Sequence, residues 1–174
     1  MPKIIENLQE KLLAEAKRQV LNEGYSAMTI RSVAKACGVG VGTVYNYYES
    51  KDMLVASFML EDWLAYKERI ETGCAGNATP ESALHCVFDE LCRFAEKYAG
   101  VFQDESAESV FASSFRQRHK MLRSQIARPL LHLCEQQEKV KPEFLAEFLA
   151  ETLLTWSQSD CTFEEISGVL LQLF

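Results

Sequence analysis

The sequence predicts an all-α protein with about nine helices, arranged as an N-terminal three-helix head followed by a helical body. Apolar residues recur at spacings of three and four along most of the chain, which is typical of amphipathic helices. No segment shows the alternating polar and apolar pattern of a strand. Four prolines and eight glycines in 174 residues argue against a disordered, Pro/Gly-rich chain.

The first expected helix has one apolar stripe, formed by Ile5, Leu8, Leu12, Ala16 and Val20. It ends at Gly24, a residue suited to a left-handed cap. Thr29 can cap a short second helix, which ends at Gly38. A third short helix is expected at about 41–47, so three helices fit within the first 50 residues.

Ser50 caps a longer helix, and Asp52 lies favourably near the positive end of its dipole. This helix spans 51–71 and connects the head, residues 1–50, to the body, residues 72–174. The stretch from Thr72 to Asn77 is expected to be a loop.

Thr79 and Pro80 then open an amphipathic helix, because proline suits the first helical position. Gly100 is expected to end this helix. Two further helices follow at about 104–115 and 116–138.

Pro129 lies inside the second of these helices and is expected to kink or split it, since proline removes one backbone donor. The last two helices span about 142–158 and 162–174. Thr162 with Glu165 forms a capping box at the start of the final helix.

The composition also bounds the class of protein. No run of 18 apolar residues is present, so we expect no transmembrane helix and no membrane partner. The N-terminus lacks the apolar stretch and cleavage site of a signal peptide, which favours a cytoplasmic protein. Six cysteines are scattered without a Cys-x-x-Cys pair, and we expect them to be reduced and mostly buried.

The segment from Thr29 to Lys51 carries the functional signal. It holds two helices too short to be stable alone, joined by a tight turn at Gly38. They must therefore pack against neighbouring helices, for which suitable apolar side chains are Ile30, Val33, Ala34, Val39, Val44 and Tyr48.

The second short helix has little apolar bulk and exposes Gly42, Thr43, Asn46 and Tyr47. Small residues let a helix approach base edges closely, where Asn and Thr can form hydrogen bonds. Tyrosine hydroxyls and the Lys51 ammonium can hold phosphates. This pattern indicates a helix-turn-helix whose second helix enters a DNA major groove.

The same residues resemble a known family. The run Gly24-Tyr25, Thr29-Ile30-Arg31, Ala34, Gly38-Val39, Gly42-Thr43-Val44-Tyr45, Tyr47-Tyr48 and Ser50-Lys51 is similar in register to the N-terminal domain of TetR/AcrR-type transcriptional regulators. The family often has serine and a basic or polar residue at the positions that are Gly40 and Val41 here.

The resemblance implies a role for individual residues. Base-edge contacts are expected from Gly42, Thr43 and Asn46. Phosphate contacts are expected from Thr29, Tyr45, Tyr47 and Lys51.

The resemblance further implies a ligand-responsive regulator rather than an enzyme, most often a repressor released from a palindromic operator by a small molecule. Such proteins act as homodimers, and the apolar helices at about 142–158 and 162–174 are the expected interface. No cofactor or metal is implied. The effector remains unidentified, and the residues expected to line its pocket, with core packing as the alternative, are Trp63, Tyr66, Phe88, Cys92, Phe111, Phe115, Met121 and Leu122.

The charge distribution is compatible with a DNA-binding head. The net charge is −7, but residues 1–55 hold seven Lys and Arg against six Asp and Glu, a net of +1, which leaves −8 for the remainder. An acidic body repels DNA except at the head. Many proteins are simply acidic, so charge alone decides nothing.

Two other readings remain open. His85, Asp89 and Cys92 share one side of a helix and form an incomplete zinc set, which is the only pointer to an enzyme. A basic run between Arg116 and Arg128 suits either an anionic ligand or a solvated helix face. The non-enzymatic alternative is a head that binds protein instead of DNA.

Overall fold

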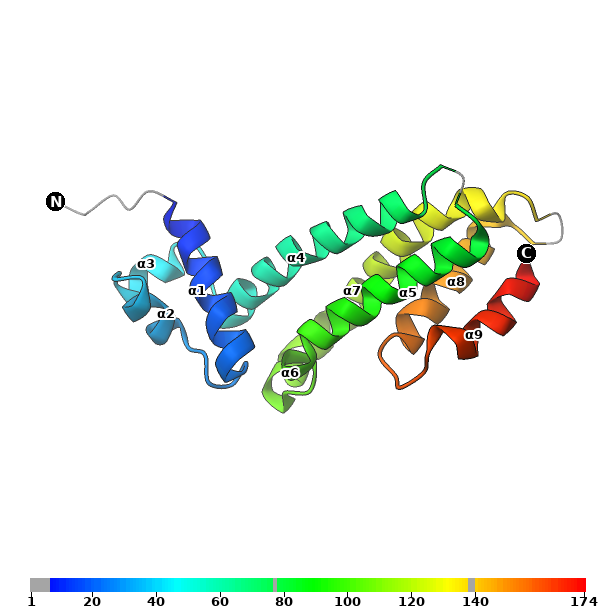
Figure 1. Ribbon diagram of the computed structural model, residues 1–174. Coiled ribbons are helices and arrows are strands. Elements are labelled where there is room, and N and C mark those ends of the chain that lie inside the picture. The colour runs from blue at the N-terminus through cyan, green and yellow to red at the C-terminus, as the bar shows by residue number, and fades with distance from the viewer. Residues whose placement is uncertain (1–6, 77, 138–139) are drawn as a thin grey trace. The chain divides into compact units, whose positions relative to one another are not determined.

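The computed structural model describes residues 7–76, 78–137 and 140–174 (Figure 1). Within these ranges the chain forms nine α-helices and a terminal 3-10 turn, without a strand. The expected all-α fold with about nine helices is confirmed. No helix in the described parts is long and apolar enough to cross a membrane.

Packing divides the chain into two units. The head unit comprises residues 1–62 and 97–113, and the body unit comprises 63–96 and 114–174. The head unit is therefore built from two stretches of the chain, which residues 63–96 of the body unit separate. The boundaries between the two units fall inside helices. The positions of helices along the sequence therefore do not show where one unit ends and the other begins.

The head unit begins with α1 (Leu8–Glu23), α2 (Ile30–Ala36), α3 (Val41–Tyr45) and the first half of α4 (Lys51–Gly73). To these it adds α6 (Ala99–Phe102) and the start of α7 (Glu105–Cys134). Its buried side chains come from each of these helices and from the turns between them, and include Leu12, Ala16, Met28, Val33, Val44, Leu54, Phe58, Tyr98, Val101 and Ala107.

Local signals set the ends of the head helices as the sequence predicts. Thr29 caps α2 in a reciprocal box, because its hydroxyl accepts from the Ser32 backbone and the Ser32 hydroxyl accepts from the Thr29 backbone. Ser50 caps α4 by accepting from the backbone of Met53. Gly24 and Gly38 have φ of 93° and 69° at the ends of α1 and α2, a backbone region that favours glycine.

Three expected boundaries are wrong. The helix expected at 51–71 continues to Gly73, two residues into the expected loop. Gly100 does not end a helix: α5 (Pro80–Lys97) stops at Lys97, and Gly100 lies inside α6. The cause is Tyr98, whose backbone leaves the helical region with φ of −110° while its side chain becomes fully buried.

The third boundary concerns α7. The sequence predicts separate helices at about 104–115 and 116–138, but α7 is one helix of 30 residues with Pro129 inside it. A proline costs the helix one backbone hydrogen bond. Ile126 and Leu130, which flank it, are both buried in the core of the body unit, so tertiary packing holds the helix together across this position.

The body unit combines parts of α4, α5 and α7 with α8 (Pro142–Trp156), α9 (Phe163–Leu170) and the 3-10 turn Leu171–Leu173. Thr162 and Glu165 form the expected capping box at the start of α9. One continuous apolar core joins these helices, with fully buried members that include Leu84, Val87, Leu130, Leu149, Ala150 and Leu153.

The turn at Gly38 gives a testable prediction. A Cβ added at Gly38 meets no atom within 4 Å, so alanine there is penalised by its positive φ alone. We expect Gly38→Ala to lower the free energy of unfolding by roughly 1–2 kcal/mol, measured by urea titration. Gly100→Ala is the control, because its Cβ also meets nothing and its backbone is helical. Equal effects of the two substitutions would contradict this account.

Candidate nucleic-acid interface

The α2–α3 corner is built by a tight turn. Gly38 allows the left-handed backbone, and the Val39 amide donates to the Ala34 carbonyl at 2.9 Å to close the end of α2. Gly40 then caps α3 through backbone alone, since its carbonyl accepts from the Thr43 amide at 3.0 Å and no side chain caps the helix. The sequence pattern therefore produces two helices separated by only four residues.

Only one residue of α3 is buried. Val44 is fully enclosed and anchors the helix, and Tyr48 just beyond it is buried as well. The other side of the segment faces outward, since Tyr45 and Tyr47 are 50% and 47% exposed. Val41, Gly42 and Asn46 are exposed alongside them, so α3 presents a face that packing does not use.

Gly42 occupies an open position on this face. Its backbone is helical, and a Cβ added there meets no atom within 4 Å. Folding of this chain therefore does not require glycine at position 42. A glycine in such a place allows another molecule to approach the helix backbone closely.

The flanking positions Thr29 and Lys51 begin α2 and α4. Thr29 is exposed, and its capping box fixes its side chain. The Lys51 ammonium lies 4.0 Å from the centre of the Tyr25 ring. Burial lowers the pKa of Lys51, while the carboxylates of Asp104 and Asp52 act in the opposite direction. Lys51 is thus held at the first turn of α4 and remains partly exposed.

All seven residues predicted to contact DNA lie on the head unit, at the starts of α2 and α4 and on the α3 segment. Thr43 and Lys51 are partly exposed, and the other five residues are exposed. Together these residues offer hydroxyls, an amide and one cation on and around α3, which is chemistry suited to base edges and phosphates.

A partly buried ion cluster ties helices of the head unit together. The Asp62 carboxylate on α4 pairs with the ammonium of Lys17 on α1 and with that of Lys97, the latter at 2.5 Å. It also accepts the hydroxyl of Tyr98 at 2.6 Å. The Tyr98 ring stacks on Phe58 with centroids 6.2 Å apart. We call Asp62, Lys17, Lys97 and Tyr98 the Asp62 cluster.

A second carboxylate ties the same distant segment to the head. Asp104 accepts from the hydroxyl of Ser26 at 2.6 Å and from its backbone amide at 3.2 Å. Hydrogen bonds from Ser106 and then Ser26 hold the pKa of Asp104 below its ordinary value. Ser26 lies in the turn between α1 and α2, so this contact fixes the approach to α2.

Sequence reasoning missed both carboxylates. Asp62 lies 45 residues from Lys17 and 36 from Tyr98, and no local motif links such positions. Tyr98 lies near the end of the amphipathic helix that the sequence predicts, and such a pattern does not reveal the partner of its hydroxyl.

Seven of the eight residues proposed for an effector pocket lie in the body unit, whereas Phe111 falls in the second stretch of the head unit. The structure gives them different environments. Trp63 and Phe88 are core residues, and the Trp63 indole donates to Gln125 at 2.6 Å. Tyr66, Cys92 and Leu122 are partly buried against that core, whereas Met121 is exposed. The side chains of Phe111 and Phe115 lie outside the described residues.

The incomplete zinc set has another structural role. The His85 ring stacks on Phe163 with centroids 4.4 Å apart, and its Nε2 lies 3.5 Å from Asp89. Among the described residues no group of three or more His, Cys, Asp or Glu side chains is placed to hold a metal. His85 therefore packs one helix against another.

Comparison with known proteins identifies the head. The family model for bacterial regulatory proteins, tetR family, matches residues 12–58. The HTH-type transcriptional repressor KstR of Mycobacterium tuberculosis is 28% identical over 132 residues, which cover 70% of this chain. The chain spans 58% of the length of that repressor. An uncharacterised HTH-type transcriptional regulator of Bacillus subtilis, YvaF, is 36% identical over 64 residues, 37% of this chain and 33% of that protein.

Solved structures show that the likeness in fold extends over the whole chain. The fatty acid degradation regulator FadR from Bacillus halodurans superposes with a TM-score of 0.60 at 20% identity, covering 98% of this chain and 96% of that one. The TetR family repressor AlkX from Dietzia gives 0.64 at 14% identity, covering 94% and 97%. FadR from Bacillus subtilis, solved with stearoyl-CoA, gives 0.53 at 19% identity, covering 94% and 96%.

The Asp62 cluster predicts a pH-dependent stability. Burial alone would raise the pKa of Asp62, but the bonds from Lys17, Lys97 and Tyr98 outweigh it and hold that pKa below its ordinary value. The charged carboxylate therefore stabilises the fold above the unfolded pKa of about 3.9, and this contribution is lost as pH falls through the folded value. We expect Asp62→Asn to cost roughly 1–3 kcal/mol at neutral pH, by urea titration.

The difference between Asp62→Asn and the parent chain should shrink as the pH is lowered below about 4, where the parent carboxyl takes up a proton. Glu68→Gln is the matched control, since Glu68 is exposed on the same helix. A loss of stability that stays constant down to acid pH would show that the substitution acts through packing and not through charge.

Proposed function

We propose that this chain, which belongs to the TetR family of bacterial regulatory proteins through its N-terminal domain, binds operator DNA with α3 in the major groove. The family consists of transcriptional regulators and not of enzymes. The observation that carries the proposal is the exposed face of α3, which is held to the head by Val44 and leaves Gly42, Tyr45 and Tyr47 without a packing role.

In this proposal Gly42, Thr43 and Asn46 contact the edges of the bases. The bare backbone at Gly42 lets α3 sink toward the floor of the groove. Asn46 can pair with an adenine edge, and Thr43 can donate a hydrogen bond or touch a thymine methyl. These contacts would select the operator sequence.

We expect phosphate contacts from Thr29, Tyr45, Tyr47 and Lys51. Tyr45 ends α3, and the other three lie before and after this helix along the chain. Hydroxyls and the Lys51 ammonium are groups that bind backbone oxygens and set the register of a protein on the duplex. The Asp62 cluster supports this arrangement by tying α1 to α4, the helix that begins with Lys51.

We further propose that the protein acts as a homodimer through α8 and the segment from α9 to the C-terminus. Phe144 and Phe148 on α8 are 67% and 47% exposed, and Val169 on α9 is 67% exposed. Exposed large apolar side chains on adjacent helices favour a partner surface. Two heads would then reach successive major grooves roughly 34–36 Å apart, which predicts a palindromic operator.

In this scheme residues 1–50 are the DNA-binding domain, 51–71 the connecting helix, and 72–174 the part that binds effector and partner. A small molecule releases the repressor if it binds the DNA-free state more tightly. The Bacillus subtilis FadR, which has a similar fold, was solved in complex with stearoyl-CoA, and this supports a small-molecule ligand here. The candidate pocket residues remain Trp63, Tyr66, Phe88, Cys92, Phe111, Phe115, Met121 and Leu122.

The role of α3 is tested by Gly42→Ala. A methyl group at position 42 fits the free protein, and alanine favours a helix, so the free energy of unfolding should not fall. It would stand between the helix and the base edges, and we expect affinity for a promoter fragment beside the gene to drop about tenfold or more. Fluorescence anisotropy at several salt concentrations measures both the affinity and its electrostatic part.

Gly100→Ala is the matched control for this experiment, because it also adds a methyl group to an open helical position of the head unit. It should bind DNA like the parent chain. If no promoter fragment competes better than random DNA, or if Gly42→Ala binds as tightly as the parent, the proposed reading head is wrong.

The dimer is tested by Phe144→Asp. Phe144 is largely exposed in the first turn of α8, where a carboxylate also suits the helix dipole, so the folded protomer should be retained. We expect sedimentation velocity to show a monomer, with weaker operator binding. Leu21→Asp on α1, another exposed apolar position, should leave the dimer intact. An unchanged dimer in Phe144→Asp would exclude this surface.

A further inference from the structure

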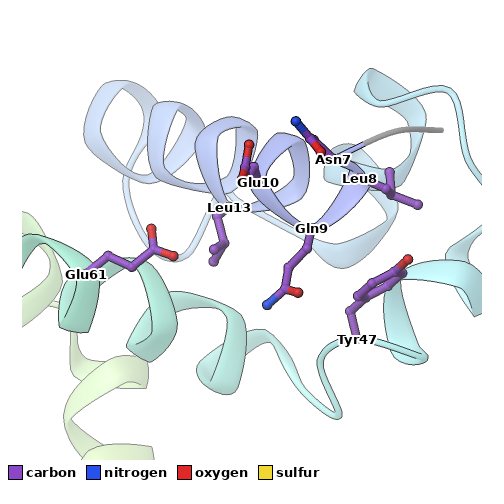
Figure 2. A pocket seen from close by; sticks show the side chains of 7 residues that line it. All are labelled: Asn7, Leu8, Gln9, Glu10, Leu13, Tyr47 and Glu61. Atoms are coloured by element: carbon purple, nitrogen blue, oxygen red, sulfur yellow. The ribbon is translucent and has the colours of Figure 1, made fainter.

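Lys51 is the one cation among the seven residues expected to contact DNA, so the placement of its ammonium group matters for binding. The surface next to Tyr47 carries the opposite charge. A groove there has Glu10 and Glu61 among its lining residues, and none of the described residues that line it is Lys or Arg (Figure 2). Phosphates that approach α3 therefore depend on Lys51 for local attraction.

The ring of Tyr25 holds this ammonium group. Tyr25 follows Gly24 in the turn between α1 and α2 and is only 3% exposed, so the packing of the head unit fixes it. The Lys51 Nζ atom lies 4.0 Å from the centre of the ring, within the range in which an aromatic face attracts a cation. A flexible lysine side chain is thus held by a buried and fixed ring.

The carboxylates near Lys51 are engaged by other donors. Asp52 accepts the hydroxyl of Tyr25, and Asp104 accepts the hydroxyl and the backbone amide of Ser26. Both carboxylates favour the charged form of Lys51 and so oppose the lowering of its pKa by burial. In the part of the chain that the structure describes, no ion pair or side-chain hydrogen bond includes Lys51. Its N–H groups therefore remain available to an acceptor from outside.

An aromatic ring differs from a carboxylate as the partner of a cation. A carboxylate would accept the N–H groups and cancel the charge, whereas a ring attracts the cation through its quadrupole and leaves N–H groups for a phosphate oxygen. The hydrogen bond from the Tyr25 hydroxyl to Asp52 also increases the electron density of the ring. Tyr25 thus orients Lys51 and at the same time keeps the adjacent carboxylate engaged.

We propose that Tyr25 is a positioning residue for DNA binding. Its ring holds the Lys51 ammonium and its hydroxyl engages Asp52, so that Lys51 meets a backbone phosphate already oriented and without a competing ion pair. A side chain that is fixed before binding loses less conformational entropy when the complex forms. The inference rests on the proposed function, since Tyr25 has this role only if Lys51 contacts the operator.

The contact between the two side chains can be measured without DNA. Reductive methylation places ¹³C-methyl groups on the lysine nitrogens and preserves their charge. We expect the Lys51 methyl resonances, identified by their absence in Lys51→Met, to lie upfield of those of exposed Lys35 because of the ring current. Tyr25→Leu should abolish this displacement, and Tyr25→Phe should retain it. A Lys51 resonance at the position of Lys35 in the parent chain would overturn the proposal.

A double-mutant cycle with the promoter fragment then tests the role of the contact. We expect Tyr25→Leu to weaken binding about fivefold and to reduce the slope of log affinity against log salt concentration by about one per head. In the Lys51→Met background the same substitution should have little further effect. Tyr25→Phe keeps the ring but releases Asp52, so its affinity should fall between those of Tyr25→Leu and the parent chain.

Phe58→Leu is the matched control, because it also removes a buried aromatic ring from the head unit, and no described cation lies over that ring. Its effect on affinity should be the same in the parent and in the Lys51→Met background. Additive effects of Tyr25→Leu and Lys51→Met would overturn the proposal, since a purely structural role gives that result. If Tyr25→Leu does not fold, the cycle with Tyr25→Phe, which barely changes packing, makes the same comparison.

Failure of the proposed function has a different signature. In that case no promoter fragment would compete better than random DNA, while the Lys51 resonance would still be displaced by the ring. The positioning role would then fall together with DNA binding, although the contact would stand. Specific DNA binding without coupling between Tyr25 and Lys51 would instead overturn this inference alone.

Discussion

The Asp62 carboxylate is the contact on which the geometry of the head depends. Three donors from two distant segments converge on it: Lys17 from α1, and Lys97 and Tyr98, which are consecutive residues at the end of α5. A partly buried carboxylate is stable only when its desolvation is offset by such partners. Since α2 and α3 are too short to be stable alone, their orientation follows from the frame of α1 and α4 that this carboxylate joins.

How much of this could be predicted depended on how far apart the cooperating residues lie in the chain. The caps at Thr29, Ser50 and Thr162 act within three residues, so the sequence predicted them correctly. The expected end at Gly100 failed because the helix ends where Tyr98 turns toward a partner 36 residues away. The unbroken α7 has the same kind of cause, because packing on both sides of Pro129 offsets a local defect.

The candidate DNA-binding face and the candidate effector pocket also differ in how far the sequence predicts them. The face of α3 was predictable because a short helix with one buried residue, Val44, leaves its remaining side chains for another purpose. An effector pocket is not predictable from apolar side chains such as Trp63 and Phe88, since a core and a pocket use the same residue types.

The head unit is built from two stretches of chain, residues 1–62 and 97–113. The sequence that encodes the head unit is therefore interrupted by residues 63–96, which fold with the body unit. A single genetic crossover near residue 62 would join a foreign body to this head and deprive Asp62 of Lys97 and Tyr98, and Ser26 of Asp104. Heads and bodies of such proteins can be recombined only if the short segment around α6 is inherited together with the head, so evolution of operator and effector specificity is linked through these few residues.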